Sequence, residues 1–595
     1  MVTYKAPLED IRFVLYELLG YEETIAALPD YGEATRDMVD AVLDEAARFC
    51  ENELLPLNGP GDLEGCTLEN GNVRTPKGFK EAYRAFTEAG WTGLACDPAL
   101  GGQGLPNVLQ FVLEELICST NLSFGVYPGL SHAGYSTLVL HSSDEQRRLF
   151  LQQIVEGKWT SSMCLTEPQC GTDLGLVRTK AVPNGNNTYK ITGAKIFISA
   201  GEHDLTENII HLVLARLPDA PSGTRGISLF IVPKFLVAPD GSLGARNGVT
   251  CGSIEHKMGI KASSTCALNF DAAEGYLVGE PNKGMRYMFS MMNTARLAIG
   301  LQGLGLAETA YQSAVAYARE RLQGRSLSGA KFPEKPADPI IVHPDVRKNL
   351  LTIRAYNEGA RALALWVGMA MDLAAKHPDP GRRKEADDFV ALMTPVIKAF
   401  VTDYGFEATN LGLQVFGGYG YIRDFGMEQL VRDARIAQIY EGTNGIQALD
   451  LVGRKMPQHA GRLLRRFFHP VSQFIEENAN NTELQEFVGP LAKAFGRLQQ
   501  VTLWVAQEGL KDREQAGAAA GEYLRMFALV ALAYLWARMA KVALGKLGGE
   551  KDAFYQAKLA TARFYMRRLL PQTSSLMAAI MSGAGSIMDV REEWF

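Results

Sequence analysis

The chain has 595 residues, more than one hydrophobic core usually contains, so several domains are expected. Hydrophobic residues make up 47% of the chain and charged residues 21%, which is the composition of an ordinary globular protein and not of a disordered one. Its 60 basic and 66 acidic side chains leave a formal net charge of −6 without a long run of either sign, which argues against nucleic-acid binding and a polybasic membrane patch.

The first part of the chain is predicted to be helical. Apolar residues between Met38 and Ala47 recur at intervals of three and four, which is the period of an amphipathic helix. The segment Asp97–Pro106 is rich in Gly and Pro and interrupts this pattern as a loop. We therefore expect an N-terminal extension over residues 1–34 and a helical domain over residues 35–160.

A β-rich domain is predicted over residues 161–284. Short β-branched runs, such as Ile209–Leu214 and Gly226–Val232, are separated by Asn-Gly, Pro-Asp and Ser-Gly breakers. This pattern is typical of an antiparallel sandwich or barrel. Because no segment of helical length lies between the runs, a doubly wound parallel sheet is not expected.

Helices are expected again in the rest of the chain. Between Leu304 and Leu322, apolar residues recur along one face of a helix. A proline-rich connection between Pro333 and Pro344 follows. A helical bundle is predicted over residues 285–455 and an additional helical domain over residues 456–595. The fold class is therefore α+β, with the order helical, β, helical, helical.

Membrane, metal and disulfide functions are not expected. The longest apolar run, Met526–Ala537, is shorter than the roughly 18 residues of a membrane span and is predicted to be a buried helix. The start, Met1–Pro7, lacks a secretory signal, so a cytoplasmic protein is expected. The 8 cysteines and 9 histidines show no Cys-x-x-Cys, His-x-His or His-x-x-x-His spacing, so we predict no metal.

Two candidate sites lie in the β-rich segment. Met163–Asp173 is a polar turn, in which Thr166, Thr172 and backbone amides are donors suited to the polar edge of a planar cofactor. Alternation further along places Phe197 and Ser199 on the same face of a strand, where they could meet a flavin ring. The alternatives are a capped hairpin loop for the first and ordinary core packing for the second.

Two more candidates lie in the helical part. The glycines of Gln414–Tyr421 allow a backbone to approach a ligand or another helix closely, but the spacing and context are not those of a Rossmann motif. In Tyr440–Gln447 a helical pattern breaks at Gly442 and leaves Glu441 at the break. A partly desolvated carboxylate there would suit a general base. The alternative is a solvated helix-end carboxylate, which the helix dipole disfavours.

Together, these four stretches resemble the acyl-CoA dehydrogenase family in their order and separation, from about Thr35 to Lys455. The opening Tyr4–Leu8 and the long helical tail are similar to the large bacterial subgroup, which includes 3-methylmercaptopropionyl-CoA dehydrogenases and some fatty acyl-CoA dehydrogenases. The resemblance implies an FAD-dependent enzyme that converts an acyl-CoA, straight-chain or 3-methylthiopropanoyl, to the trans-2-enoyl-CoA. It further implies that electron-transfer flavoprotein takes the electrons.

The resemblance also implies residue roles. Glu441 is expected to remove the α-proton of the thioester. FAD contacts are expected from Leu165, Thr166, Phe197, Ser199, Arg321, Gln414, Gly417, Gly418 and Thr443. Thr172 and Arg296 are expected to contact the acyl-CoA. Because Arg321 matches an arginine that reaches FAD across a subunit boundary, a homodimer or a dimer of dimers is implied.

Two departures from the family pattern and two rival functions remain. Gly324 stands where the family often has an aromatic residue, and Asn293 stands where an acidic residue precedes Arg296 by three positions. These departures affect flavin packing and CoA contacts, respectively. The rival enzyme is an acyl-CoA oxidase that uses oxygen. The rival from another class is a non-catalytic acyl-CoA-binding or assembly protein, against which the retained Glu441 argues.

Overall fold

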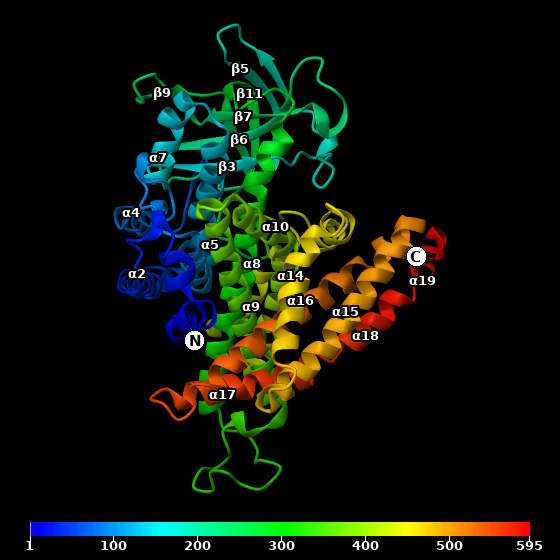
Figure 1. The fold of residues 1–595 in the computed structure, drawn as a ribbon. Coiled ribbons are helices and arrows are strands. Elements are labelled where there is room, and N and C mark those ends of the chain that lie inside the picture. The colour runs from blue at the N-terminus through cyan, green and yellow to red at the C-terminus, as the bar shows by residue number, and fades with distance from the viewer. Residues whose placement is uncertain (1) are drawn as a thin grey trace. The chain divides into compact units, whose positions relative to one another are not determined.

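The structure is a computed structural model that describes residues 2–595, and the chain divides into two units, each assembled from separate segments (Figure 1). Unit 1 comprises Met1–Ala47, Pro106–Ser119 and Ile299–Phe595, and unit 2 comprises Arg48–Leu105 and Thr120–Ala298. Two long helices contribute residues to both units: α5 (Asn107–His141) and α8 (Gly284–Glu320).

Unit 2 contains the predicted β-domain as a seven-stranded sheet. Its strands are β3 (Trp159–Cys164), β4 (Lys180–Pro183), β5 (Tyr189–Ser199), β6 (Asn208–Arg216), β7 (Ile227–Pro233), β10 (Val249–Ile254) and β11 (Thr265–Leu277). The hydrogen-bonded order is β10-β11-β5-β4-β6-β3, with β7 paired to β11 and β6. Most pairs are antiparallel, as predicted. However, β3 and β4 pair with β6 in parallel, which makes the sheet mixed.

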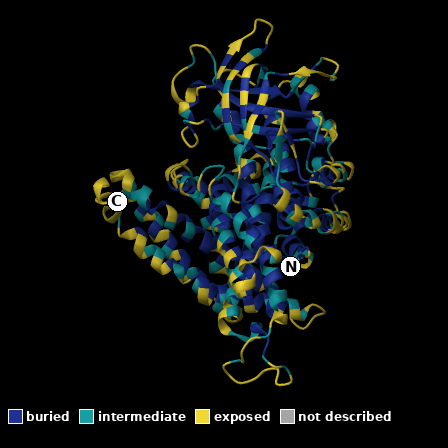
Figure 2. Ribbon diagram, turned by 180° about the vertical axis from the view of Figure 1, so that it is seen from behind, coloured by how far each residue is buried: buried dark blue, intermediate teal, exposed yellow. Residues whose placement is uncertain are grey.

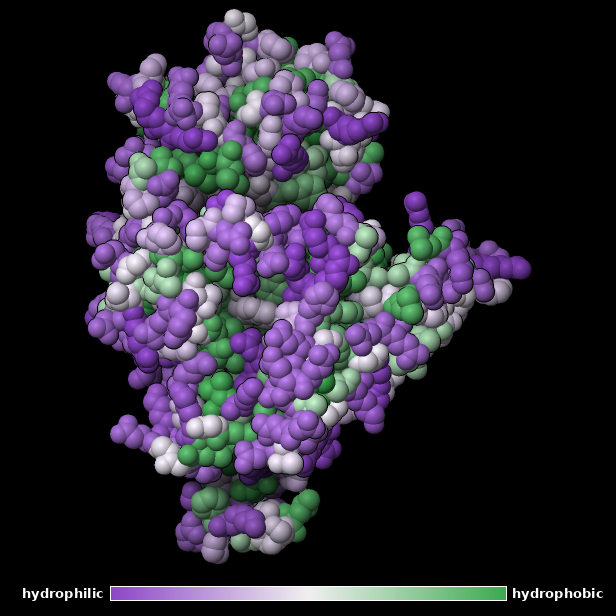
Figure 3. Space-filling model, in the orientation of Figure 1, coloured by the Kyte–Doolittle hydropathy of each residue, from purple (hydrophilic) through white to green (hydrophobic). Residues whose placement is uncertain are grey.

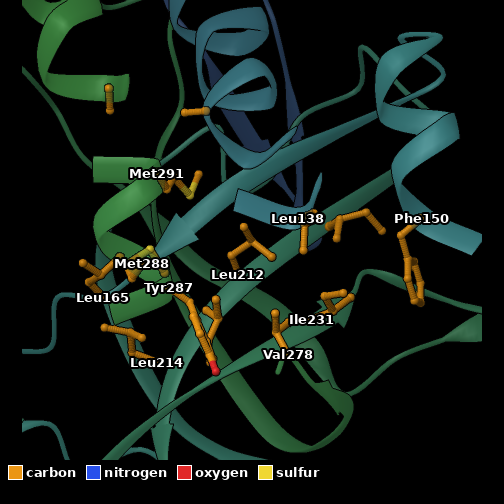
Figure 4. Close-up of a cluster of buried hydrophobic side chains, with 14 of the residues drawn as sticks. Leu138, Phe150, Leu165, Leu212, Leu214, Ile231, Val278, Tyr287, Met288 and Met291 are labelled. Atoms are coloured by element: carbon orange, nitrogen blue, oxygen red, sulfur yellow. The ribbon is translucent and has the colours of Figure 1, made fainter. Parts of the chain in front are cut away.

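The sheet of unit 2 is buried on both faces around β6. Leu212 and Leu214 point into one core, which also contains Met288 and Met291 from the start of α8 (Figure 4). Val213 points into a second core on the opposite face. Because successive side chains of a strand alternate between faces, an uninterrupted apolar run such as β6 suits a strand covered on both sides.

Smaller elements complete unit 2. Two hairpins are formed by β1 (Thr67–Glu69) with β2 (Asn72–Arg74), and by β8 (Phe235–Val237) with β9 (Leu243–Arg246). Its other α-helices are α3 (Leu55–Glu64), α4 (Phe79–Glu88), α6 (Asp144–Gln146) and α7 (Gln152–Val155). The predicted loop over residues 97–106 is confirmed, apart from one short 3₁₀ turn over Pro98–Leu100.

Unit 1 is helical. Besides its parts of α5 and α8 it contains α1 (Leu8–Arg12), α2 (Arg36–Phe49, which ends in unit 2), α9 (Pro344–Lys376), α10 (Pro380–Val396), α11 (Thr402–Phe416), α12 (Met427–Arg435), α13 (Asn444–Asp450), α14 (Arg462–Glu477), α15 (Gln485–Lys511), α16 (Arg513–Leu544), α17 (Asp552–Phe564), α18 (Gln572–Met581) and α19 (Gly585–Met588). In Figure 2 the buried residues of these helices lie on their inner faces and the exposed ones outside. Figure 3 shows that hydrophilic side chains cover most of the visible surface.

The apolar run Met526–Ala537 is fully buried in α16, which packs against α9, α15, α17 and α18. The predicted buried helix is therefore confirmed. By length and composition, Pro380–Tyr421 and Arg513–Leu544 are apolar enough to cross a membrane, but 78% of the most apolar window of each is buried inside the protein. Burial of this kind is what the core helices of a globular bundle show.

A buried ion network joins five helices of unit 1. The guanidinium of Arg361 on α9 contacts three carboxylates, at 2.5 Å, 2.6 Å and 3.0 Å, from Asp10, Glu115 and Glu308. The ammonium of Lys558 on α17 contacts Asp10 as well. Burial opposes the charge on Arg361, but these carboxylates raise its pKa well above its ordinary value. The guanidinium of Arg361 therefore stays ionised inside the core.

Candidate active site

Glu441 lies in a tight turn between two helices of unit 1. Helix α12 ends at Arg435, and α13 begins at Asn444. Glu441 has φ +56° and the next residue, Gly442, has φ +84°. The left-handed conformation costs a non-glycine residue roughly 1–2 kcal/mol, so the surroundings must impose it on Glu441. Residues held in this way are often functional.

Hydrogen bonds from the surrounding side chains fix this turn. The Nε2 of Gln447 donates to the carbonyl of Glu441 at 3.1 Å, and Nζ of Lys398 donates to the carbonyl of Gly442 at 2.8 Å. Thr443 caps α13, because its Oγ1 accepts the backbone N–H of Ile446 at 3.4 Å. The side chain of Glu441 is half-buried, and these bonds fix the backbone that follows it.

The glycine-rich stretch after α11 divides into packed and open positions. A Cβ on Gly420 would meet the carbonyl oxygen of Leu413 at 2.4 Å, so close packing requires this glycine. By contrast, a Cβ on Gly417 or Gly418 would meet nothing within 4 Å, and both residues are exposed, as is Gln414. Backbone at these two positions is therefore accessible to a ligand.

Arg321 is exposed at the end of α8, with its guanidinium carbon 5.5 Å from the ring centroid of Tyr419. The loop that follows it is folded around Asp338. The carboxylate of Asp338 accepts backbone N–H groups of Ser326 and Phe332 at 2.9 Å and 2.8 Å. Burial opposes ionisation, but these bonds hold the pKa of Asp338 below its ordinary value.

Gly324 lies in this loop with φ +68°, a conformation that an aromatic residue adopts only with strain. The departure from the family pattern at this position is therefore accompanied by a backbone conformation that favours glycine.

A second group of predicted residues meets in unit 2. Leu165 and Thr166 follow directly after β3; Leu165 is buried and Thr166 half-buried. The Leu165 carbonyl accepts from Nζ of Lys195 at 3.0 Å, and the Thr166 carbonyl accepts from the N–H of Ile196 at 2.9 Å. The polar turn is thus attached to β5, the strand that carries Phe197.

Phe197 is exposed because β5 contains a bulge. Lys195 pairs with Leu268 and Ile198 pairs with Cys266, so two residues of β5 lie opposite one of β11. Phe197 is one of these two; it has φ +58°, and it is 59% exposed. Simple alternation does not describe this region, but Phe197 and the half-buried Ser199 both lie outside the core while Ile198 is buried between them. Bulges that redirect a side chain are common next to active sites.

The two predicted substrate-binding residues differ in their surroundings. Thr172 is exposed in the polar turn of unit 2. Arg296 on α8 is buried, with its guanidinium carbon 5.9 Å from the ring centroid of Phe289 and its Nη1 3.4 Å from Oδ1 of Asn293. Asn293 therefore gives Arg296 a neutral acceptor where an acidic residue would give a charged one.

The carboxylate next to Thr166 is committed to a buried ion pair. Oε1 of Glu167 lies 2.8 Å from Nζ of Lys195, and the two side chains are 4% and 0% exposed. Burial by itself raises the pKa of Glu167, but the charge of Lys195 and hydrogen bonds from Thr179 lower it to about 2. Glu167 is therefore ionised and fully engaged, which makes it unsuitable as a general base.

This pair predicts a pH-dependent contribution to stability. Because the pKa of Glu167 in the folded state lies below the roughly 4.3 of an unfolded chain, the ionised form stabilises the fold above that pH and the benefit is lost as the pH falls towards 2. The loss of unfolding free energy in Glu167→Gln should be largest above about pH 5 and should shrink at lower pH. Urea unfolding of both proteins between pH 7 and pH 3 measures it, and a difference that is independent of pH would contradict it.

Sequence reasoning missed two polar residues that are central to these groups. Lys195 and Lys398 are both 0% exposed, and each donates to a main-chain carbonyl beside a candidate site residue. A lysine within an apolar run, such as Ile397-Lys398-Ala399-Phe400, was the available signal, because lysine is almost never fully buried unless it is paired. Within residues 2–595, no three His, Cys, Asp or Glu side chains are placed to hold a metal ion.

The residues present fit a flavin cofactor. Unit 2 offers an exposed aromatic ring, Phe197, close to the hydroxyl-bearing Thr166 and Ser199. Such a surface suits one face and the polar edge of an isoalloxazine ring. Unit 1 offers exposed backbone at Gly417 and Gly418 with open space around it, which suits the extended part of a dinucleotide.

The chain is similar to known proteins over nearly its whole length. Family models match residues 37–158, 162–273 and 282–456, described as the N-terminal, middle and C-terminal domains of acyl-CoA dehydrogenase; residues 467–591 match one described as acetyl-CoA dehydrogenase C-terminal like. The chain is 42% identical to the 3-methylmercaptopropionyl-CoA dehydrogenase of Ruegeria pomeroyi, over 99% of each protein. It is 34% identical to a broad-specificity linear acyl-CoA dehydrogenase of Mycobacterium tuberculosis, over 100% of each.

Solved structures show the same fold. ACDH-11 of Caenorhabditis elegans, in complex with C11-CoA, is 19% identical with a TM-score of 0.77, over 100% of this chain and 93% of that one. An acyl-CoA dehydrogenase of Bacillus anthracis complexed with FAD is 21% identical with a TM-score of 0.69, over 97% and 95%.

Proposed function

Since the chain belongs to the family of acyl-CoA dehydrogenases, which are FAD-dependent oxidoreductases, we propose that it oxidises an acyl-CoA thioester to the trans-2-enoyl-CoA with Glu441 as the base. The observation that carries this assignment is the turn at Glu441. A half-buried carboxylate is held there in a left-handed conformation, on a backbone that Gln447 and Lys398 fix. A base held in one position is what proton abstraction from carbon requires.

In the proposed reaction the Glu441 carboxylate takes the α-proton of the thioester. That proton is weakly acidic, so the negative charge that develops on the thioester oxygen needs hydrogen-bond donors already in place. We assign the backbone N–H of Glu441 to this role, because the turn fixes its direction. FAD, when bound, supplies the acceptor for the hydride that leaves the β-carbon.

FAD contacts are proposed for two groups of residues, each within its own unit. In unit 2 these are Leu165, Thr166, Phe197 and Ser199. In unit 1 they are Arg321, Gln414, Gly417, Gly418 and Thr443. Thr172 and Arg296 are proposed to contact the acyl-CoA.

Gly418 allows a test of this assignment that leaves the protein's own packing intact. A side chain at Gly418 would meet no protein atom near its Cβ, so Gly418→Leu should fold normally but occupy space proposed for FAD. Forcing extra methyl groups into a filled site costs about 1–3 kcal/mol, so FAD should bind about 5- to 150-fold more weakly. Titration of the apoprotein with FAD, followed by fluorescence quenching, measures this change.

Gly496 supplies the matched control. A Cβ on this exposed glycine of α15 also meets nothing within 4 Å. Gly496→Leu should therefore bind FAD as tightly as the parent. Equal FAD affinity in all three proteins would remove Gly418 from the proposed site.

The substrate is proposed to be either a straight-chain fatty acyl-CoA or 3-methylthiopropanoyl-CoA, in line with the activities named for the two relatives. Anaerobic bleaching of the bound flavin by straight-chain, branched and 3-methylthiopropanoyl thioesters tests the function and ranks the substrates. If thioesters bind but none bleaches the flavin, the protein binds acyl-CoA without oxidising it. If the reduced enzyme produces peroxide in air at the rate of turnover, it is an oxidase.

The proposal also includes the electron acceptor and the oligomeric state. Electron-transfer flavoprotein is proposed as the electron acceptor in the cytoplasm, and its reduction by the substrate-reduced enzyme tests that step. Because Arg321 is proposed to serve the FAD of a neighbouring subunit, the protein should be a homodimer or a dimer of dimers. A flavin-loaded monomer in light scattering would contradict this arrangement.

A further inference from the structure

Lys398 is a buried cation whose donors are directed at the Glu441 turn. It lies in a turn of π-helix, Ile397–Val401, between α10 and α11, and it is 0% exposed. Removing an ammonium from water costs several kcal/mol unless it is well paired. Its Nζ donates to the carbonyl of Gly442 at 2.8 Å and to Oδ1 of Asn444 at 2.8 Å. Both acceptors belong to the short segment that begins with Glu441.

A second set of hydrogen bonds connects the two sides of the turn. Nδ2 of Asn444 donates to the carboxylate of Asp403 at 2.6 Å and to Oγ1 of Thr402 at 2.9 Å. Nε2 of Gln438, which precedes the turn, donates to the same Asp403 oxygen at 2.8 Å. Oγ1 of Thr402 in turn donates to the carbonyl of Lys398 at 2.7 Å. The segments before and after the turn therefore share one network with Lys398.

The network bears on the left-handed backbone conformation of Glu441. A left-handed glutamate reverts to an ordinary conformation unless neighbouring peptides are fixed. The peptide that follows Glu441 ends in the carbonyl of Gly442, and an ammonium is a stronger donor for it than a neutral group. Gln447 also donates to this carbonyl, at a longer 3.4 Å. Loss of the Lys398 donor leaves this weaker bond alone, so the Gly442 peptide rotates more freely and the Glu441 side chain moves with it.

We infer that Lys398 is a positioning residue for Glu441: its ammonium fixes the Gly442 peptide and thereby the direction of the base. This inference rests on the proposed function, because it requires that Glu441 abstracts a proton. A misplacement of about 1 Å costs roughly 100-fold in rate, so removal of the ammonium should slow proton abstraction about 10- to 100-fold. Binding of thioester and FAD should not change, because Lys398 belongs to neither proposed contact set.

The test measures proton abstraction alone. An acyl-CoA with α-hydrogens but no hydrogen on its β-carbon cannot be dehydrogenated, yet a positioned base exchanges its α-hydrogens with D₂O. NMR follows this exchange in the holoenzyme, and calorimetry gives the affinity for the same thioester. Lys398→Met, which keeps the side chain as far as Cε and removes the ammonium, should exchange 10- to 100-fold more slowly than the parent at unchanged affinity.

Lys558→Met is the matched control. Lys558 is also buried in unit 1, but its ammonium contacts Asp10 and Glu358 instead of the turn. Both substitutions should lower stability, and only Lys398→Met should slow exchange. Exchange at the parental rate in Lys398→Met, or equal slowing in both variants, would overturn the inference.

Asn444→Ala keeps the inference testable if Lys398→Met fails to fold. It removes one acceptor of Lys398 and the bonds to Asp403, and it should slow exchange by a smaller factor than Lys398→Met; an unchanged rate overturns the inference. The Glu441→Gln protein separates this outcome from failure of the proposed function. If the parent does not exchange, or if Glu441→Gln exchanges like the parent, the proposed base is wrong. If the parent exchanges and Glu441→Gln does not, but the Lys398 and Asn444 variants exchange at the parental rate, the proposed base stands and the inference about Lys398 is wrong.

Discussion

Glu441→Gln is expected to lower turnover about 10²- to 10⁴-fold while FAD and acyl-CoA remain bound. The amide keeps the size and hydrogen-bonding reach of the carboxylate but has no basic oxygen. The turn should keep its conformation, because the hydrogen bonds from Gln447 and Lys398 described above are accepted by main-chain carbonyls and not by the Glu441 side chain. The expected result is therefore a loss of rate with little change in binding.

Stopped-flow reduction of the flavin by the best thioester measures the effect, and the flavin spectrum on titration with enoyl-CoA measures binding. Glu428→Gln is the control in the same unit, since Glu428 forms an ion pair with Arg432 one helical turn away. It should reduce the flavin at the parental rate. If Glu441→Gln kept both FAD and the parental rate of reduction, another group would be the base.

Among the substitutions proposed, Arg361→Met is expected to cause the largest loss of stability, about 3–5 kcal/mol in the free energy of unfolding. The substitution removes the guanidinium that Asp10, Glu115 and Glu308 share and leaves buried carboxylates without their main partner. Glu115 and Glu308 then repel each other in a medium where water cannot screen them. Removing one partner of a buried ion pair costs far more than removing a surface charge.

Urea unfolding followed by tryptophan fluorescence measures this loss. The control is Arg36→Met, because Arg36 pairs with Glu22 at 3.5 Å with both side chains about half exposed. An exposed pair of this kind contributes about 0–1 kcal/mol, so the control should unfold near the parental urea concentration. If Arg361→Met were no less stable than Arg36→Met, the network would have no net stabilising role.

Local sequence pattern predicted those parts of the fold that depend on burial over a few residues. The apolar run Met526–Ala537 is a buried helix, and Ile209–Leu214 lies in a strand buried on both faces. Whether two strands pair in parallel or antiparallel was less predictable. Strand β3 runs parallel to β6 because the chain returns to it after β4 and β5, and side-chain alternation contains no information about such a return.

The candidate site was predictable at its turns and not in its supporting contacts. A helical pattern that breaks at Gly442 indicated Glu441 directly. Lys398, however, contacts Gly442 across a separation of 44 residues, which no local period reveals. The bulge that exposes Phe197 was also missed, because it depends on the register between β5 and β11.

The ion network of unit 1 has a consequence for the synthesis of the chain on the ribosome. Asp10 and its partner Lys558 are separated by 548 residues, so at about 5–20 residues per second Asp10 is made roughly half a minute to two minutes before Lys558. All residues of unit 2 have been added by Ala298, whereas unit 1 combines the first 47 residues with the last segment. Unit 2 can therefore fold while translation continues. The first helix waits for nearly the whole chain, and a product terminated before Lys558 carries a carboxylate that has lost one of its two cations.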